Sequence, residues 1–224
     1  AQTECSQPPA ARTFPVHHHP TSSASDPQLR LETLLVRSGT GTDPATGAIT
    51  TPIHLSTAYG HPGLGESTGY DYTRTASPTR DVLQDALARL EGGTAAFALS
   101  SGMAALELVT RTLAPHGSRI VALRDLYGGS FRFLEVLAEE GAARVDFVLG
   151  LEGLRGALAD PADLVIIETP TNPMMEEISI PEAAELARAA GARLVVDNTF
   201  YTPVVQRPLE LGADVVVHSG TKYL

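Results

Sequence analysis

Five places in the sequence combine residue types that could act together in catalysis, and each follows a short apolar segment. In chain order they are the Ser-Ser-Gly-Met turn at 100–103, the Tyr-Gly-Gly turn at 127–129, Glu168, Asp197 and Lys222. One carboxylate or lysine after a strand is usually a helix cap or a solvated side chain. Five such places at one sheet edge predict a binding cleft, because ligands of open α/β sheets bind beyond the carboxyl ends of the strands.

The chemistry of this set indicates pyridoxal 5′-phosphate. The turn at 100–103 opens a predicted helix, whose free N–H groups and dipole can hold a phosphate. A lysine amine can form a Schiff base with the cofactor, a carboxylate such as Asp197 can keep the pyridine nitrogen protonated, and Tyr127 can stack on the ring. No G-x-x-x-x-G-K-[ST] motif occurs, which argues against a P-loop nucleotide site.

The elements that must position these residues follow from the apolar pattern. Continuous apolar segments predict strands at 94–99, 119–123, 144–149, 163–167, 193–196 and 214–217. Helical spacing predicts helices at 78–91, 102–114, 128–141, 152–159 and 181–191. Segments that are apolar throughout are typical of strands covered on both faces. The fold class is therefore α/β, a doubly wound and mostly parallel sheet with helices on both faces.

The chain divides into three predicted parts. Residues 1–28 are rich in Pro, Ser and Thr and predict a disordered tail, 29–76 an irregular N-terminal arm, and 77–224 the α/β domain. His17, His18 and His19 lie in the tail; a solvated segment is the favoured interpretation, although three imidazoles could bind a metal weakly. We expect no metal site.

Composition excludes several classes of protein. The chain is 43% hydrophobic and 19% charged, which predicts a packed core rather than a disordered protein. No apolar run approaches the roughly 20 residues of a membrane-spanning helix. Sixteen basic against 26 acidic residues give a net charge of −10, so neither nucleic acid nor membrane is an expected partner. The single cysteine, Cys5, fits a cytoplasmic protein without internal disulfides.

Longer motifs show a resemblance to a known family. They are GYDYTRTASPTR, LEGG, SSGM, DLYGGS, ETPTNP and VVDNTFYTPVVQRPLELGADVVVHSGTKYL. These resemble the Cys/Met-metabolism pyridoxal-phosphate enzymes of fold type I, and the segment 43–75 is most similar to their cystathionine γ-synthase and O-acetylhomoserine thiol-lyase branch. The resemblance covers about residues 30–224.

The resemblance implies roles for individual residues. Lys222 corresponds to the Schiff-base lysine and catalytic base, and Tyr127 stacks on the ring and assists proton transfer. The other implied cofactor contacts are Asp197 at the pyridine nitrogen, Asn172 near the ring hydroxyl, and Gly102, Met103, Ser219 and Thr221 at the phosphate. Tyr72 and Arg74 would reach the phosphate of a neighbouring subunit, so the resemblance implies a homo-oligomer with shared sites. Arg132 would lie near the distal end of a substrate.

Three positions bear on which branch of the family this chain resembles. Ser77 stands where Asn is usual and Gly220 where Ala is usual, and neither change removes a catalytic group. Gly129 stands where methionine γ-lyases tend to have Cys, which argues against that branch.

The implied reaction is γ-replacement on an O-acylated homoserine by cysteine or sulfide, giving cystathionine or homocysteine. A cystathionine β- or γ-lyase is the alternative within the family. Because the family continues after this lysine with a substrate-carboxylate site, an incomplete, non-catalytic fragment is the alternative of another class.

Overall fold

The computed structural model describes residues 29–224 except Thr42 and Pro44. The predicted tail, with Cys5 and the three adjacent histidines, lies outside the described residues. The described chain forms two compact units, one of Thr40–Thr79 and one of Leu29–Gly39 with Arg80–Leu224. In neither is any described helix long and apolar enough to cross a membrane.

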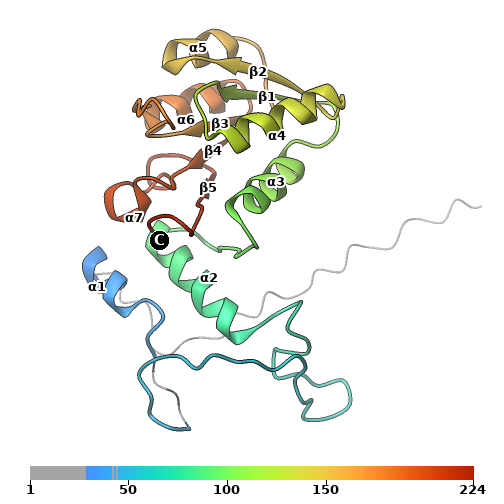
Figure 1. The fold of residues 1–224 in the computed structure, drawn as a ribbon, viewed down its shortest axis with the longest axis vertical. Coiled ribbons are helices and arrows are strands. Elements are labelled where there is room, and N and C mark those ends of the chain that lie inside the picture. Colours follow the sequence, from blue (N-terminus) through green and yellow to red (C-terminus); the bar gives the residue numbers. More distant parts are fainter. Residues whose placement is uncertain (1–28, 42, 44) are drawn as a thin grey trace, which may run out of the picture. The chain divides into compact units, whose positions relative to one another are not determined.

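The larger unit is built on a parallel sheet (Figure 1). Its five strands, in the spatial order β2-β1-β3-β4-β5, are β1 (Ser118–Leu123), β2 (Ala143–Val148), β3 (Leu164–Glu168), β4 (Arg193–Asp197) and β5 (Val215–Val217). Every neighbouring pair is parallel. The α/β class predicted from the sequence is confirmed.

Helices connect the strands in crossovers on both faces of the sheet (Figure 1). The helices are α1 (Leu31–Arg37), α2 (Pro78–Glu91), α3 (Gly102–Leu113), α4 (Gly128–Glu139), α5 (Gly150–Ala157), α6 (Ile180–Ala189) and α7 (Thr202–Val205). Helix α3 packs with α4, and α5 packs with α6. Crossovers between parallel strands are right-handed. Because the crossover from β1 leads to one edge of the sheet and those after β2 lead toward the other edge, these two helix pairs lie on opposite faces.

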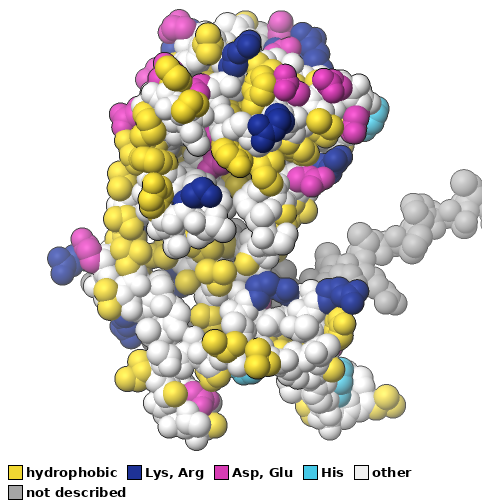
Figure 2. Space-filling view, in the orientation of Figure 1, with side chains coloured by type: hydrophobic (Ala, Val, Ile, Leu, Met, Phe, Trp, Pro, Cys, Tyr) yellow, Lys and Arg dark blue, Asp and Glu magenta, His cyan; other side chains and the backbone are white. Residues whose placement is uncertain are grey.

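The core follows from the apolar strands. Ile120, Val165 and Val195, on the three central strands, are fully buried. Apolar side chains on both faces of a central strand meet a helix layer on each side, which removes them from water. Outside this core, acidic and basic side chains are interspersed on the visible face around α4 and α5 (Figure 2).

The strand predicted at 94–99 is wrong. Residues 95–99 have no strand pairing, and Phe97 is 69% exposed. The Ala98 N–H donates instead to Oε1 of Gln84, at 3.0 Å. A strand needs a neighbour for its backbone groups, and in the described structure the sheet ends at β5 without including this segment. The apolar composition indicated a strand, but composition does not report whether a pairing partner is present.

The smaller unit has little regular structure. Isolated bridges join Thr40 to Thr50 and Ala58 to Tyr72, and turns connect them. The Asp43 carboxylate accepts hydrogen bonds from the N–H groups of Ala45 and Thr46, as is typical of turns. Across this unit, turns of this kind take the place of helices and paired strands.

Candidate active site

A cavity of about 250 Å³ lies at the carboxyl edge of the sheet in the larger unit. It is lined by Ser101, Gly102, Met103, Leu106, Tyr127, Ser130, Glu168, Asn172, Asp197, Thr199, Ser219, Thr221 and Lys222. All the cofactor residues expected from the sequence are among them except Tyr72 and Arg74. The strand order switches between β1 and β3, because β2 is added on one side of β1 and the later strands on the other. Open α/β sheets bind ligands near such a switch point.

The start of α3 forms one wall of the cavity. Ser101 caps the helix, its Oγ accepting the Ala104 N–H at 3.1 Å. The first N–H groups of a helix have no partner within it, which leaves those of Gly102 and Met103 for a ligand. A Cβ on Gly102 would lie 2.8 Å from the Ser219 Cβ, so only glycine allows this close approach. The cavity therefore has an electropositive helix start beside a serine hydroxyl.

The loop after β5 supplies the hydroxyls and the amine. Ser219 Oγ lies 3.1 Å from Thr221 Oγ1, and Lys222 Nζ donates to the same Thr221 oxygen at 3.1 Å. Lys222 is the only lysine in the sequence, since every other basic residue among the 16 is arginine. The sole side-chain amine of the chain thus lies in this cavity.

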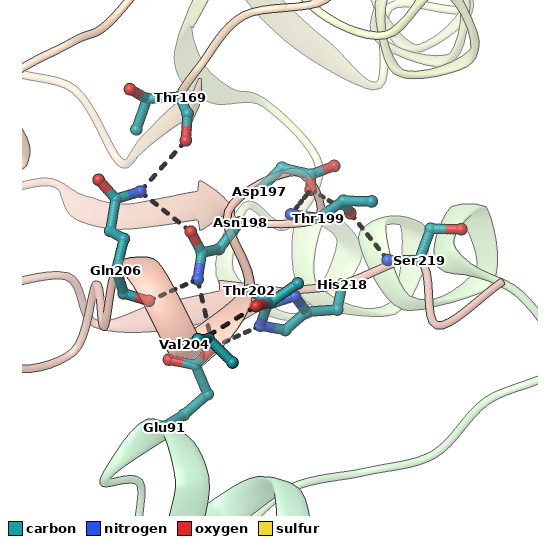
Figure 3. Close-up of polar contacts among 10 residues, drawn as sticks. All are labelled: Glu91, Thr169, Asp197, Asn198, Thr199, Thr202, Val204, Gln206, His218 and Ser219. Atoms are coloured by element: carbon teal, nitrogen blue, oxygen red, sulfur yellow. Dashed lines mark hydrogen bonds and ion pairs between the residues drawn. The ribbon is translucent and has the colours of Figure 1, made fainter. Parts of the chain in front are cut away.

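Asp197, the last residue of β4, is held by a short chain of hydrogen bonds. Its Oδ1 accepts hydrogen bonds from the backbone N–H of Thr199 at 3.0 Å and the Thr199 hydroxyl at 2.6 Å. The Ser219 N–H donates to the same Thr199 hydroxyl oxygen at 2.8 Å (Figure 3). Both bonds to Asp197 use Oδ1, so Oδ2 is left for a ligand. These hydrogen bonds fix the carboxylate relative to the loop that carries Lys222.

Glu168 is a second carboxyl group in the cavity wall. It is 7% exposed, and its Oε2 accepts the Tyr127 N–H at 2.6 Å. Burial raises the pKa of Glu168 to about 8; the Tyr127 N–H opposes this shift, and the nearby charges of Asp197 and Asp125 add to it. Glu168 is therefore mainly protonated at neutral pH and holds the Tyr127 turn.

Tyr127 packs closely over the start of α4. A Cβ on Gly129 would lie 2.5 Å from the Tyr127 ring and 3.0 Å from the Met103 sulfur. Any larger residue at 129 must therefore displace the ring or the sulfur. The residue type at position 129, noted in the sequence, therefore affects where the Tyr127 ring can lie.

Three expected residues do not line the cavity. Arg132 is exposed on α4, with its guanidinium folded back toward Gly128. Tyr72 and Arg74 belong to the smaller unit, where the Arg74 guanidinium lies 5.3 Å from the centre of the Tyr72 ring. Their roles at a substrate or at a neighbouring subunit stay predictions.

Five residues that line the cavity were not expected as cofactor contacts: Ser101, Leu106, Ser130, Glu168 and Thr199. Glu168 was recognisable only as a strand-end carboxyl group. Ser101 belongs to the turn recognised in the sequence, and Thr199 stands two residues after Asp197, a spacing that places both on one side of an extended chain. Leu106 and Ser130 lie inside helices, where no local sequence signal marks them.

One further motif lies outside this site. Residues 65–69 match the G-x-S-x-G pattern of nucleophile elbows, with Ser67 at the centre. The Ser67 hydroxyl donates to Asp71 at 2.6 Å, and the segment lies in exposed turns. A nucleophile elbow joins a strand to a helix, and neither flanks this segment. The match has no catalytic geometry.

The donor set of the cavity fits pyridoxal 5′-phosphate. The helix start and the hydroxyls of Ser219 and Thr221 fit a phosphate, and the carboxylate of Asp197 fits a protonated ring nitrogen. Tyr127 provides an aromatic face, and Lys222 provides the amine for covalent attachment. The missing Cβ of Gly102 keeps its N–H accessible to such a ligand.

Comparison with known proteins agrees with this geometry. Residues 32–224 match the family model described as Cys/Met metabolism PLP-dependent enzyme. The cystathionine gamma-synthase of Haemophilus influenzae is 47% identical over 88% of this chain and 54% of its own. A cystathionine beta-lyase of Lactococcus lactis subsp. cremoris is 40% identical over 87% of this chain and 51% of its own.

A solved structure has the same fold. The cystathionine gamma synthase of Xanthomonas oryzae pv. oryzae, crystallised with aminoacrylate and cysteine, superposes with a TM-score of 0.84 at 43% identity. The alignment covers 87% of this chain and 51% of that protein. The chain spans about half the length of the relatives that it matches.

Proposed function

Because the chain belongs to the Cys/Met-metabolism family of pyridoxal-phosphate-dependent enzymes, we propose that its cavity is the cofactor site of a trans-sulfuration enzyme. The proposed reaction is γ-replacement: cysteine or sulfide replaces the acyloxy group at Cγ of an O-acylated homoserine, this group leaves as a carboxylate, and cystathionine or homocysteine forms. The observation that carries the proposal is the meeting of Lys222, Asp197 and the start of α3 in one cavity.

The residues of the chain have distinct tasks in this proposal. When bound, pyridoxal phosphate supplies an electron-withdrawing ring that accepts negative charge from the α-carbon of an amino acid. Asp197 would hold the proton on the ring nitrogen, while Thr199 fixes the carboxylate. Lys222 Nζ would take and return protons at substrate carbons, and Tyr127 would offer an aromatic face to the ring.

A cystathionine lyase is the second candidate, and the 40% identity to a lactococcal cystathionine beta-lyase favours it specifically. The two activities separate in a substrate panel. A synthase forms cystathionine from O-acetylhomoserine and cysteine, whereas a lyase consumes cystathionine and water and releases a thiol, a keto acid and ammonia.

We further propose that the site is shared between copies of the chain, with Tyr72 and Arg74 contacting the cofactor phosphate of a neighbouring copy. Their mutual contact presents a cation and a hydroxyl together, which suits a phosphate. The test uses oligomers that combine unsubstituted and Arg74→Ala copies, with their assembly checked by sedimentation. In cofactor titrations of these oligomers, Arg74→Ala should lower the cofactor affinity of the neighbouring copy. An effect confined to the substituted copy contradicts sharing.

The single lysine makes a direct test of cofactor attachment possible. Purified chain is incubated with pyridoxal phosphate, reduced with borohydride and digested, and the adduct is located by mass spectrometry. We expect the adduct at Lys222 and its loss in Lys222→Ala, with the α-amino group as the only other primary amine of the chain. An adduct of equal yield on the Lys222→Ala chain, or one found only at the N-terminus, overturns the proposal.

A further inference from the structure

A buried polar cluster lies against the ends of β4 and β5, outside the cavity wall. Its centre is Glu91, the last residue of α2, which is 3% exposed. The Glu91 Oε1 atom lies 2.5 Å from Nε2 of His218 and accepts a hydrogen bond from Nδ2 of Asn198 at 3.3 Å (Figure 3). Both partners directly adjoin residues of the cavity.

This position is unfavourable for a glutamate in two respects. A negative charge at the carboxyl end of a helix opposes the helix dipole, and a buried carboxylate loses its hydration. The nearby cation Arg207 pairs with Glu210, at 2.5 Å. The contacts that compensate Glu91 for its burial are therefore those to His218 and Asn198.

The cluster and the cavity use alternate residues of the same segments. Asp197, Thr199 and Ser219 line the cavity, whereas the intervening Asn198 and the preceding His218 do not. Each segment therefore presents one side chain to the ligand site and the next to Glu91. A shift of either segment would move both sets together.

Further bonds extend the cluster to a third strand end. The Asn198 amide donates to the Gln206 carbonyl at 2.9 Å and accepts from the Gln206 side chain at 3.0 Å. The same Gln206 Nε2 donates to the Thr169 carbonyl at 3.1 Å, and the Asn198 N–H donates to Val217 O at 3.0 Å. The ends of β3, β4 and β5 are thus joined to the end of α2.

We propose that Glu91 is a positioning residue: through His218 and Asn198 it fixes the spacing between the Asp197 carboxylate and the loop that carries Lys222. The inference rests on the proposed function in so far as that spacing serves cofactor binding. Glu91 acts through its neighbours and makes no contact with the ligand. Its effect is exerted at one oxygen, Oε1, because both contacts use that atom.

The first test needs no cofactor. Hydrogen exchange is measured on the 224-residue chain, its Glu91→Leu and Glu91→Gln variants, and Glu107→Leu as a control at an exposed ion pair with Arg111. In Glu91→Leu we expect the amides of Asn198, Ser219 and Lys222 to exchange at least about 10-fold faster, with β1 and β3 unchanged. Glutamine keeps the Oε1 acceptor, so Glu91→Gln should stay close to the unsubstituted chain.

The outcomes separate positioning from general stability. Faster exchange throughout β1 and β3, or equal effects of leucine and glutamine, would show that Glu91 is only a structural residue and overturns the inference. If Glu91→Leu does not fold, Asn198→Leu and His218→Phe provide the test at the partner side chains. Unchanged exchange in all folded variants also overturns it.

The second test measures release of pyridoxal phosphate after dilution. We expect release about 10-fold faster from Glu91→Leu and an unchanged rate from Glu91→Gln and Glu107→Leu. If the unsubstituted chain binds no cofactor at Lys222, the proposed function fails, while the exchange experiment still decides the role of Glu91. If all release rates are equal while the amides near Glu91 still exchange faster, Glu91 orders only the loop. That outcome overturns its proposed link to the cofactor site.

Discussion

Glu168 illustrates how a single residue gains its properties from the fold. Its position after an apolar segment marks it as a strand-end residue, but burial beside Asp197 and Asp125 is what favours its neutral form. Desolvation penalises the charged form more than the Tyr127 N–H stabilises it. The result is a protonated carboxyl group in the wall of a cavity that Lys222 and Asp197 also line.

The raised pKa of Glu168 predicts a pH dependence of stability. Between pH about 4.5 and about 8 the folded chain holds a proton that the unfolded chain releases, so the free energy of unfolding falls as pH rises. The effect is at most about 1.4 kcal/mol per pH unit and disappears outside that interval. Glu168→Gln, which keeps an acceptor for Tyr127, should remove this decline.

Urea unfolding of the chain without cofactor at pH 5.5, 6.5 and 7.5 measures this difference. The Glu168→Gln variant should gain stability relative to the unsubstituted chain as pH rises, and the exposed control Glu107→Gln should not. Parallel stability curves for all three proteins contradict the assignment of a raised pKa.

At the scale of elements, the site depends on how closely α3 approaches the loop after β5. Gly102 and Ser219 come from segments more than 100 residues apart, and their contact leaves no room for a Cβ. The contact also brings the helix N–H groups next to the loop hydroxyls. Packing of two elements, rather than any one motif, therefore creates this wall of the cavity.

Replacement of Gly102 by alanine should separate these elements. A Cβ 2.8 Å from the Ser219 side chain and 3.0 Å from its Cα requires a backbone shift, and overpacking of this kind costs about 1–3 kcal/mol. We expect a lower Tm and weaker binding of pyridoxal phosphate in a fluorescence titration.

Gly156→Ala is the matched control, because the added Cβ would meet no atom within 4 Å apart from its chain neighbours and the backbone of its own helix, and the residue is exposed in α5. Alanine favours a helix over glycine by up to about 1 kcal/mol, so this variant should be slightly stabilised. Equal Tm values for both glycine variants count against the close contact.

At the scale of the whole molecule, the sheet order brings together residues that are distant in the sequence. Tyr127 follows β1, Glu168 ends β3, Asp197 ends β4 and Lys222 follows β5, and parallel pairing aligns these ends at one edge. The central strand β3 has neighbours on both sides and is buried along its length. Stability of β3 and integrity of the site are therefore coupled.

Ile166→Ala tests this coupling. The side chain is 1% exposed in the middle of β3, and such a truncation costs about 2–5 kcal/mol. We expect that loss in urea unfolding, together with weaker cofactor binding. Val136→Ala, at a residue 45% exposed on α4, should change stability by no more than about 0.5 kcal/mol, and a similar loss there would contradict the assignment of the core.

Much of this arrangement could be predicted from the sequence, and the exceptions have physical causes. The segments around Ile120, Val165 and Val195 indicated buried parallel strands because they are apolar on both faces. The segment around Phe97 was mispredicted because pairing depends on a neighbour, which composition does not encode. Cavity residues at strand ends were recognisable, whereas the contact of Glu91 with His218 joins positions 127 apart in the sequence.

The alternation of side chains after β4 has a consequence for changes in chain length. Asp197 and Thr199 face the cavity while Asn198 faces Glu91, so the deletion or insertion of a single residue there would exchange the two sets. The amide would then enter the ligand site and a carboxylate would meet the buried glutamate. Variation among related genes should therefore substitute residues in this segment but preserve its length, even where neighbouring surface loops gain or lose residues.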